Sequence, residues 1–105
     1  MKYYSLNNNS KDVSFLNAVK NGLASDRGLY FPKKIPLLSK DLIKNIKSFS
    51  NHEIAFKAIE PYVGKDIPDE RLKRIIEETL SFDFPIIPIT NSISSLELFH
   101  GPTLA

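Results

Sequence analysis

The feature that most restricts the possible folds is a strongly amphipathic stretch at residues 68–81. Its apolar side chains recur at the three- and four-residue spacing of a single helix face, which has to be buried against another element. These side chains are Leu72, Ile75, Ile76 and Leu80. On the polar side, two ion pairs are expected at i, i+4 spacing, Asp69 with Lys73 and Glu70 with Arg74.

A second helix is predicted immediately before it, at residues 50–60. Ser50 and Glu53 have the spacing of a capping box, in which each side chain satisfies a backbone amide at the start of a helix. Pro61 and Gly64 are expected to mark its end. The apolar residues that follow the box are Ile54, Ala55, Ala58, Ile59 and Tyr62. Two neighbouring amphipathic helices with a short connection are expected to pack together.

Weaker signals complete an α+β fold of about four amphipathic helices with a few short strands. Ser14 and Ser39 are suitable N-caps for a short helix ending near Gly22 and for a helix at residues 38–48. The first of these helices carries an apolar face made of Leu16, Val19 and Leu23. Short strands are expected near residues 2–6, 28–31 and 94–99.

Two connecting segments have distinctive turn chemistry. Asp26 opens a turn in which Gly28 takes the third position, where type II geometry requires a positive φ. Pro85 and Pro88 bracket two isoleucines, which favours an extended connector over a central strand. Asn91 and Ser92 are expected to turn the chain into its last strand.

Composition excludes several classes of function. With 14 basic and 12 acidic residues, the net charge of +2 gives no reason to expect nucleic acid or an anionic membrane as a partner. There is no cysteine, hence no disulfide and no thiolate ligand or nucleophile. No stretch approaches the length of a membrane span or a secretory signal, so a cytoplasmic location is expected.

Few residues are candidates for chemistry. Neither His52 nor His100 has the spacing of a metal ligand, so no metal site is expected. His52 is expected to be a solvent-exposed residue in the first turn of a helix. A turn is expected after the last strand, at His100, Gly101 and Pro102. His100 could either form a structural hydrogen bond or contact a ligand there, and the residues alone favour the hydrogen bond. Thr103 suits a helix N-cap or a ligand contact.

The sequence stops at "LELFHGPTLA", within an apolar stretch and at the start of an expected helix. Chain ends are usually polar and poorly held. We therefore expect this sequence to be a piece of a longer protein.

Three segments, "MKYYS", "VSFLNAVKNGLASDRGLYFP" and "LELFHGPTLA", resemble in that order the N-terminal part of the threonine synthase family. In that family the last motif continues with Phe-Lys-Asp, whose lysine holds pyridoxal phosphate. The resemblance implies that residues 1–93 form the N-terminal domain of a fold type II enzyme and that residues 94–105 begin its catalytic domain. One departure is Arg27, where the family usually has glycine; we expect a type II turn to accept it.

The family's reaction converts O-phospho-L-homoserine and water into L-threonine and phosphate. By resemblance, His100, Gly101, Pro102 and Thr103 would lie beside cofactor and substrate, and the helices would pack on the downstream catalytic domain. Because the lysine lies beyond Ala105, no catalytic residue is expected in this sequence, and alone it should be inactive and hold no cofactor. Two alternatives remain: a related phospholyase releasing phosphate and 2-oxobutyrate, and a non-catalytic interaction module.

Overall fold

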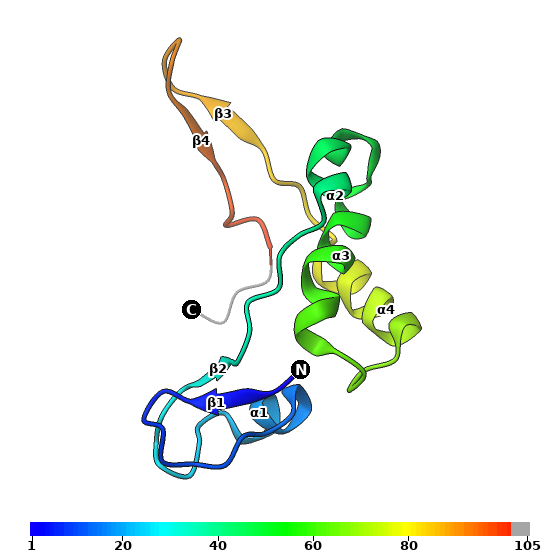
Figure 1. Cartoon of the computed structure of the whole chain (residues 1–105). Helices are drawn as coiled ribbons and strands as arrows, with labels where there is room; N and C mark the ends of the chain where they lie inside the picture. Colours follow the sequence, from blue (N-terminus) through cyan, green and yellow to red (C-terminus); the bar gives the residue numbers. More distant parts are fainter. Residues whose placement is uncertain (102–105) are drawn as a thin grey trace.

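The computed structural model describes residues 1–101 and has an α+β fold, as predicted (Figure 1). Its elements in chain order are β1 (Tyr3–Ser5), α1 (Phe15–Asn21), β2 (Tyr30–Pro32), α2 (Lys40–Lys44), the 3-10 turn η1 (Ile46–Ser48), α3 (Asn51–Val63), α4 (Asp69–Thr79), β3 (Ile86–Pro88) and β4 (Ser94–Leu96). The expected helix at 38–48 is therefore divided into α2 and η1. Among the helices of residues 1–101, none is both long and apolar enough to cross a membrane.

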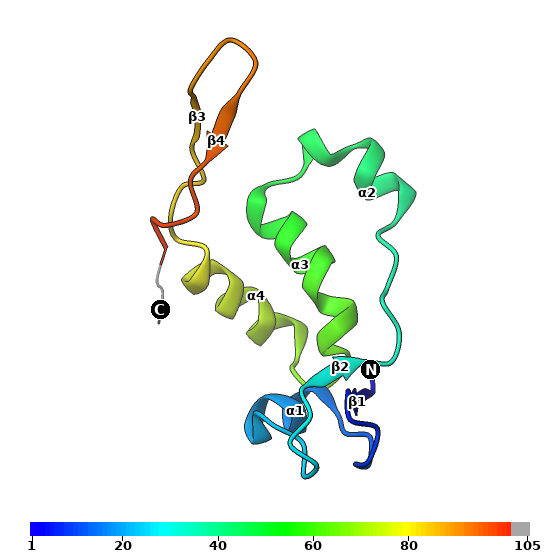
Figure 2. The same ribbon diagram turned by 90° about the vertical axis from the view of Figure 1, so that its left-hand side faces the viewer.

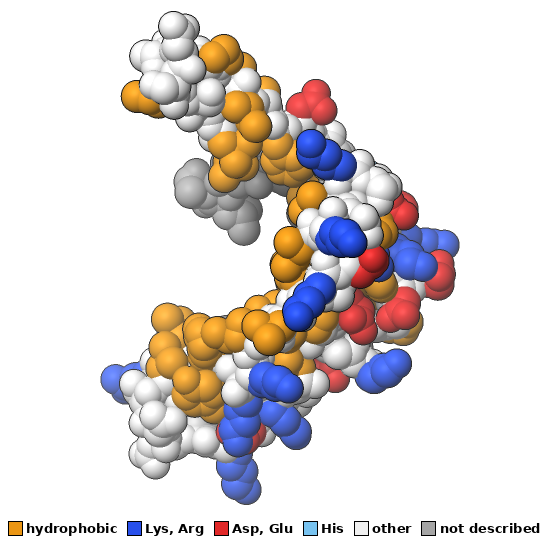
Figure 3. All heavy atoms as spheres, turned by 45° about the horizontal axis from the view of Figure 1, so that its top comes forward, with side chains coloured by type: hydrophobic (Ala, Val, Ile, Leu, Met, Phe, Trp, Pro, Cys, Tyr) orange, Lys and Arg blue, Asp and Glu red, His pale blue; other side chains and the backbone are white. Residues whose placement is uncertain are grey.

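The elements follow an open, curved path. The β1–β2 sheet and α1 form one end, the α3–α4 pair forms the middle, and the β3–β4 hairpin projects at the other end (Figure 1). Hydrophobic side chains gather along the inner edge of the curve, and most charged side chains visible in the same view lie on its outer side (Figure 3). The curved shape leaves much of its apolar surface exposed.

The core lies between α3 and α4. Val63, Leu72 and Ile76 are 2%, 4% and 7% exposed, and each such side chain contributes roughly 1.5–3 kcal/mol by burial. The partly buried side chains packed against them are Phe15, Ala55, Phe56, Ile67 and Leu80. The predicted face of α4 is thus confirmed at Leu72 and Ile76, while Ile75 stays 40% exposed.

All three serine caps are confirmed. The Oγ atoms of Ser14, Ser39 and Ser50 each accept a hydrogen bond from the backbone N–H three residues later. At α3 the capping box is complete, because Glu53 Oε2 accepts from the Ser50 N–H at 2.7 Å.

The prediction that Pro61 helps end α3 is wrong, because Pro61 lies inside the helix. The last turn is held by tertiary contacts: Val63 enters the core and the Tyr62 carbonyl accepts from the Tyr3 hydroxyl at 2.9 Å. Gly64, with φ of 66°, then caps the helix by donating to the Glu60 carbonyl.

The predicted ion pairs of α4 are also wrong. The ion pair that α4 forms within the described residues joins Lys73 to Glu70 and not to Asp69, with Lys73 Nζ 3.3 Å from Glu70 Oε1 at i, i+3 spacing. The same Nζ lies 5.5 Å from the centre of the Phe56 ring. Contact with a ring on α3 orients Lys73 in a way that local spacing does not reveal.

Helix α1 does not bury its expected face. Leu16, Val19 and Leu23 are 52%, 64% and 52% exposed, and only Ala18 is buried within the helix. Phe15, at the first position of α1, is the side chain that reaches the α3–α4 core. The hydrophobic face of α1 is therefore open to solvent.

The turn after α1 is built around buried Ser5, whose Oγ donates to Asp26 Oδ1 at 2.6 Å. The same carboxylate accepts from the N–H groups of Gly28 and Asn9, both at 2.9 Å. The predicted type II turn is wrong, because Arg27, not Gly28, has the positive φ, 65°. Gly28 is required for space instead, since a Cβ there would lie 2.0 Å from Ser5 Oγ.

The extended connector predicted at 85–88 is a strand. β3 pairs with β4 in antiparallel register, Ile86 opposite Leu96 and Pro88 opposite Ser94. Proline is tolerated because this two-stranded sheet has only edge strands. The final strand is shorter than the expected 94–99, and Asn91 and Ser92 lie in the hairpin loop as predicted.

Adjacent substitutions in this turn should have opposite effects. Arg27→Gly relieves a left-handed conformation and should stabilise the protein by about 0.5–1 kcal/mol after the entropic cost of glycine. Gly28→Ala should destabilise it by roughly 1–3 kcal/mol, because the new methyl group overlaps Ser5. Urea denaturation measures both changes. Arg27→Ala, which keeps the strain, is the control and should match the parent protein within error.

The Ser5–Asp26 turn also predicts an acid response. The Ser5 hydroxyl, more than the backbone N–H groups of Gly28 and Asn9, holds the pKa of Asp26 below its usual value. A lowered folded pKa stabilises the protein above the unfolded value of about 3.9, and this stability is lost as the pH falls through the folded pKa. Melting temperatures between pH 2 and 6 should therefore fall less steeply below pH 4 in Asp26→Asn than in the parent. Equal acid slopes would contradict the assignment.

Candidate functional site

The candidate site is the segment Glu97–Gly101, which follows the hairpin and returns toward the end of α4 (Figure 2). Pro85 O accepts a hydrogen bond from Glu97 N at 3.0 Å, which extends the hairpin pairing by one bond. Gly101 lies directly on the Phe82 ring, since a Cβ built on it would be 2.3 Å from both Cε1 and Cζ. The Phe82 ring in turn meets Phe84 edge to face, with ring centres 4.8 Å apart. The hairpin thus brings two distant parts of the sequence together.

His100 has a carboxylate partner within this segment. Its Nε2 lies 2.7 Å from Glu97 Oε2, and its ring lies 4.5 Å, centre to centre, from the Phe99 ring. Leu98 and Phe99 are 64% and 73% exposed. The segment therefore offers an imidazole that is oriented by Glu97 and lies beside an apolar surface. The sequence prediction of a hydrogen-bonding role for His100 fits this geometry.

Pro102 and Thr103, the other two residues singled out by sequence, lie outside the described residues. Glu97–Gly101 contains no lysine, so this stretch does not fit the covalent attachment of pyridoxal phosphate. Within residues 1–101 no group of three or more His, Asp and Glu side chains could hold a metal ion.

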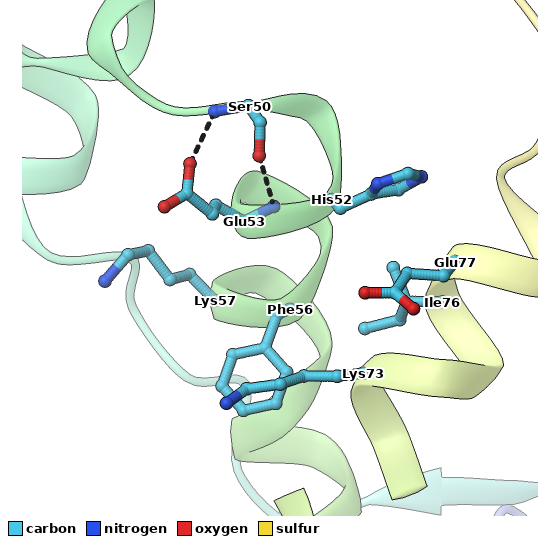
Figure 4. A pocket seen from close by; sticks show the side chains of 8 residues that line it. All are labelled: Ser50, His52, Glu53, Phe56, Lys57, Lys73, Ile76 and Glu77. Atoms are coloured by element: carbon cyan, nitrogen blue, oxygen red, sulfur yellow. Dashed lines mark hydrogen bonds between the residues drawn. The ribbon is translucent and has the colours of Figure 1, made fainter. Parts of the chain in front are cut away.

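A second candidate is a cavity of about 290 Å³ at the α3–α4 groove (Figure 4). It is lined by Ser50, His52, Glu53, Phe56, Lys57, Lys73, Ile76 and Glu77. Most of its polar groups already have structural partners: Ser50 and Glu53 form the capping box, and His52 Nε2 lies 3.1 Å from the Leu80 carbonyl. Figure 4 shows Lys73 lying along the Phe56 ring. The arrangement holds the two helices together and has no nucleophile activated by a base.

The third candidate is a hollow of about 320 Å³, which is almost wholly apolar and lies where α1, α3 and α4 meet. Its lining is Phe15, Ala55, Ile59, Val63, Ile67, Leu72, Ile75, Ile76, Thr79 and Leu80. Thr79 is the one polar side chain in this lining, so the hollow is a packing surface and not a site with several groups to orient a substrate.

The backbone fold is similar to part of the threonine synthase structure. It matches the crystal structure of threonine synthase from Escherichia coli with a TM-score of 0.88 and the pyridoxal-phosphate-bound threonine synthase from Brucella melitensis with a TM-score of 0.87. Both are 34% identical, and each comparison covers 100% of this chain and 24% of the other.

The sequence comparisons agree. Residues 2–80 match the family model described as threonine synthase N terminus, and the chain belongs to this family. It is 33% identical to threonine synthase from Serratia marcescens and 34% identical to that from Escherichia coli, over its whole length and 24% of each relative. The chain thus spans about a quarter of the length of these relatives.

Sequence reasoning did not identify Phe82 or Glu97 as part of the site. Glu97 lies three residues before His100, a spacing that could have suggested the pair. Phe82 is separated from Gly101 by the whole hairpin, and no local pattern links an aromatic residue to a glycine so far along the chain. Its only signal was the repeated aromatic in "SFDFP".

The His52 contact predicts a measurable link between α3 and α4. His52→Ala removes the side chain that meets the Leu80 carbonyl at the end of α4, and should destabilise the protein by about 0.5–1.5 kcal/mol. His52→Gln retains a hydrogen-bond donor and should lose less. Guanidinium denaturation should show a lower midpoint with an unchanged slope; equal stability of His52→Ala and the parent would contradict the role.

Proposed function

We propose that this chain is the N-terminal part of a threonine synthase that converts O-phospho-L-homoserine and water into L-threonine and phosphate with pyridoxal phosphate. The observation that carries this proposal is the similarity of the whole chain, in sequence and fold, to threonine synthases. The cofactor would act as an electron sink for carbanions next to its imine. The expected location of the enzyme is the cytoplasm.

Within that enzyme, residues 1–93 would act as an N-terminal domain and residues 94–105 would lead into the catalytic domain. Under this division β3 belongs to the first part and β4 to the second, so the hairpin would join the two domains. The open apolar face of α1 supports packing on a downstream domain, because free proteins seldom expose contiguous apolar surface of this kind.

His100, Gly101, Pro102 and Thr103 would border the cofactor and substrate. The contribution of this segment is to shape and position that border, with His100 oriented by Glu97. The lysine that holds the cofactor would follow Ala105, as the resemblance of the "HGPTLA" motif implies. By this reasoning, residues 1–105 alone neither hold the cofactor nor catalyse the reaction.

The test uses the protein from its complete reading frame, supplied with pyridoxal phosphate and O-phospho-L-homoserine. Phosphate, threonine and 2-oxobutyrate are measured in the same reaction. We expect equal amounts of phosphate and threonine, and no product from residues 1–105 assayed alone.

The other outcomes separate the alternatives. Phosphate with 2-oxobutyrate would replace the synthase by a phospholyase. If the complete protein released no phosphate, the enzymatic function would be wrong, and the interaction module would become the better account.

A further inference from the structure

We propose that Phe82 is a positioning residue for the His100–Gly101 turn, acting through direct contact of its ring with the Gly101 backbone. The inference rests on the proposed function, in which this turn borders the cofactor and substrate. In this role Phe82 would act through the turn, by setting the position of His100 and Gly101 beside the cofactor and substrate.

The Phe82 ring and the Gly101 backbone are in close contact. A Cβ on Gly101 would lie 2.3 Å from Phe82 Cε1, 2.3 Å from Cζ and 2.9 Å from Cδ1, so no residue other than glycine fits while the ring is in place. Glycine at such a position permits close approach of the backbone to a neighbouring group. The neighbouring group here is a ring of this same chain.

The Phe82 ring has its own contacts, which connect it to the helices. Phe82 is half-buried, packs edge to face with Phe84, and follows Leu80, the C-cap of α4, by two residues. The Leu80 carbonyl meets His52 of α3, and the Leu80 N–H donates to Ile76, a member of the core. The position of the ring is therefore tied to the α3–α4 pair.

The hairpin returns the chain to that ring. β3 and β4 pair from Ile86–Leu96 to Pro88–Ser94, and the Pro85–Glu97 hydrogen bond closes the base. Glu97 also holds His100 at 2.7 Å. The turn is thus held between the hydrogen bond at the hairpin base and the Phe82 ring, which follows the helix pair.

The test is a double-mutant cycle in the full-length protein, with Gly101→Ala, Phe82→Ala and both together. Gly101→Ala should lower kcat about 100-fold, because the added methyl group displaces the turn. Phe82→Ala should lower kcat on the order of tenfold, with KM nearly unchanged. In the double variant the space left by the ring accommodates the methyl group, so the effect of Gly101→Ala should be at least tenfold smaller than in the parent.

The same cycle is measured without cofactor or substrate, as the thermal unfolding midpoint of the apoprotein. Gly101→Ala should lower the midpoint in the parent and have less effect when Phe82 is alanine. Phe31→Ala is the matched control, because it removes an equal ring from the β1–β2 sheet, where Phe31 packs on Tyr4. Its effect should add to that of Gly101→Ala. Phe82→Leu, a milder change, replaces Phe82→Ala if the latter does not fold.

The outcomes distinguish the two proposals. Additive effects of Gly101→Ala and Phe82→Ala on both kcat and unfolding midpoint would overturn the role of Phe82, even if the enzyme makes threonine. Coupling confined to the unfolding midpoint, in an enzyme that makes threonine, would also overturn it, because the contact would then be structural only. Coupled midpoints in a protein that releases no phosphate would overturn the proposed function and leave the Phe82–Gly101 contact in place.

Discussion

Helices α3 and α4 pack against each other through Val63, Leu72 and Ile76, and the other parts of the chain are attached to that pair. The Tyr3 hydroxyl reaches the Tyr62 carbonyl in the last turn of α3, which connects the β1–β2 sheet to the helices. At the opposite end, the residues that follow α4 carry Phe82 and the hairpin. A change that separated the two helices would therefore move both the N-terminal sheet and the candidate site.

The sequence predicted features whose causes lie within a few residues. Each of the three serine caps is a contact between one side chain and the backbone amide three positions later, and the Ser50–Glu53 box adds the reciprocal contact. Pro61 and Gly28 show where this reasoning stops. Pro61 is kept helical by contacts made to the residues that follow it, and Gly28 is needed because Ser5 approaches it from β1. Neither neighbour can be identified from local sequence.

In the candidate site, too, the local features were predictable and the contacts between distant residues were not. His100 and Gly101 stand out in sequence because they form a distinctive turn, and their position after a strand was predicted. Their surroundings were not predictable, because the chain travels along β3, reverses, and returns along β4 before Gly101 meets Phe82. The prolines at 85 and 88 favoured an extended connector over a central strand. The rule allows proline in an edge strand, and β3 is one because its sheet has only two strands, which the local sequence does not reveal.

The exposed face of α1 needs a different explanation. Leu16, Val19 and Leu23 have the spacing of a buried face, yet all are at least half exposed. A periodic pattern predicts that a face is buried without specifying what covers it. In the proposed full-length enzyme the pattern would be right about burial and the cover would come from the downstream domain. The same domain would cover the apolar inner edge in Figure 3, because charged residues are concentrated on the opposite side of the curve. On this account the open curve is stable as part of a larger protein, and the downstream domain would complete a core that α3 and α4 begin.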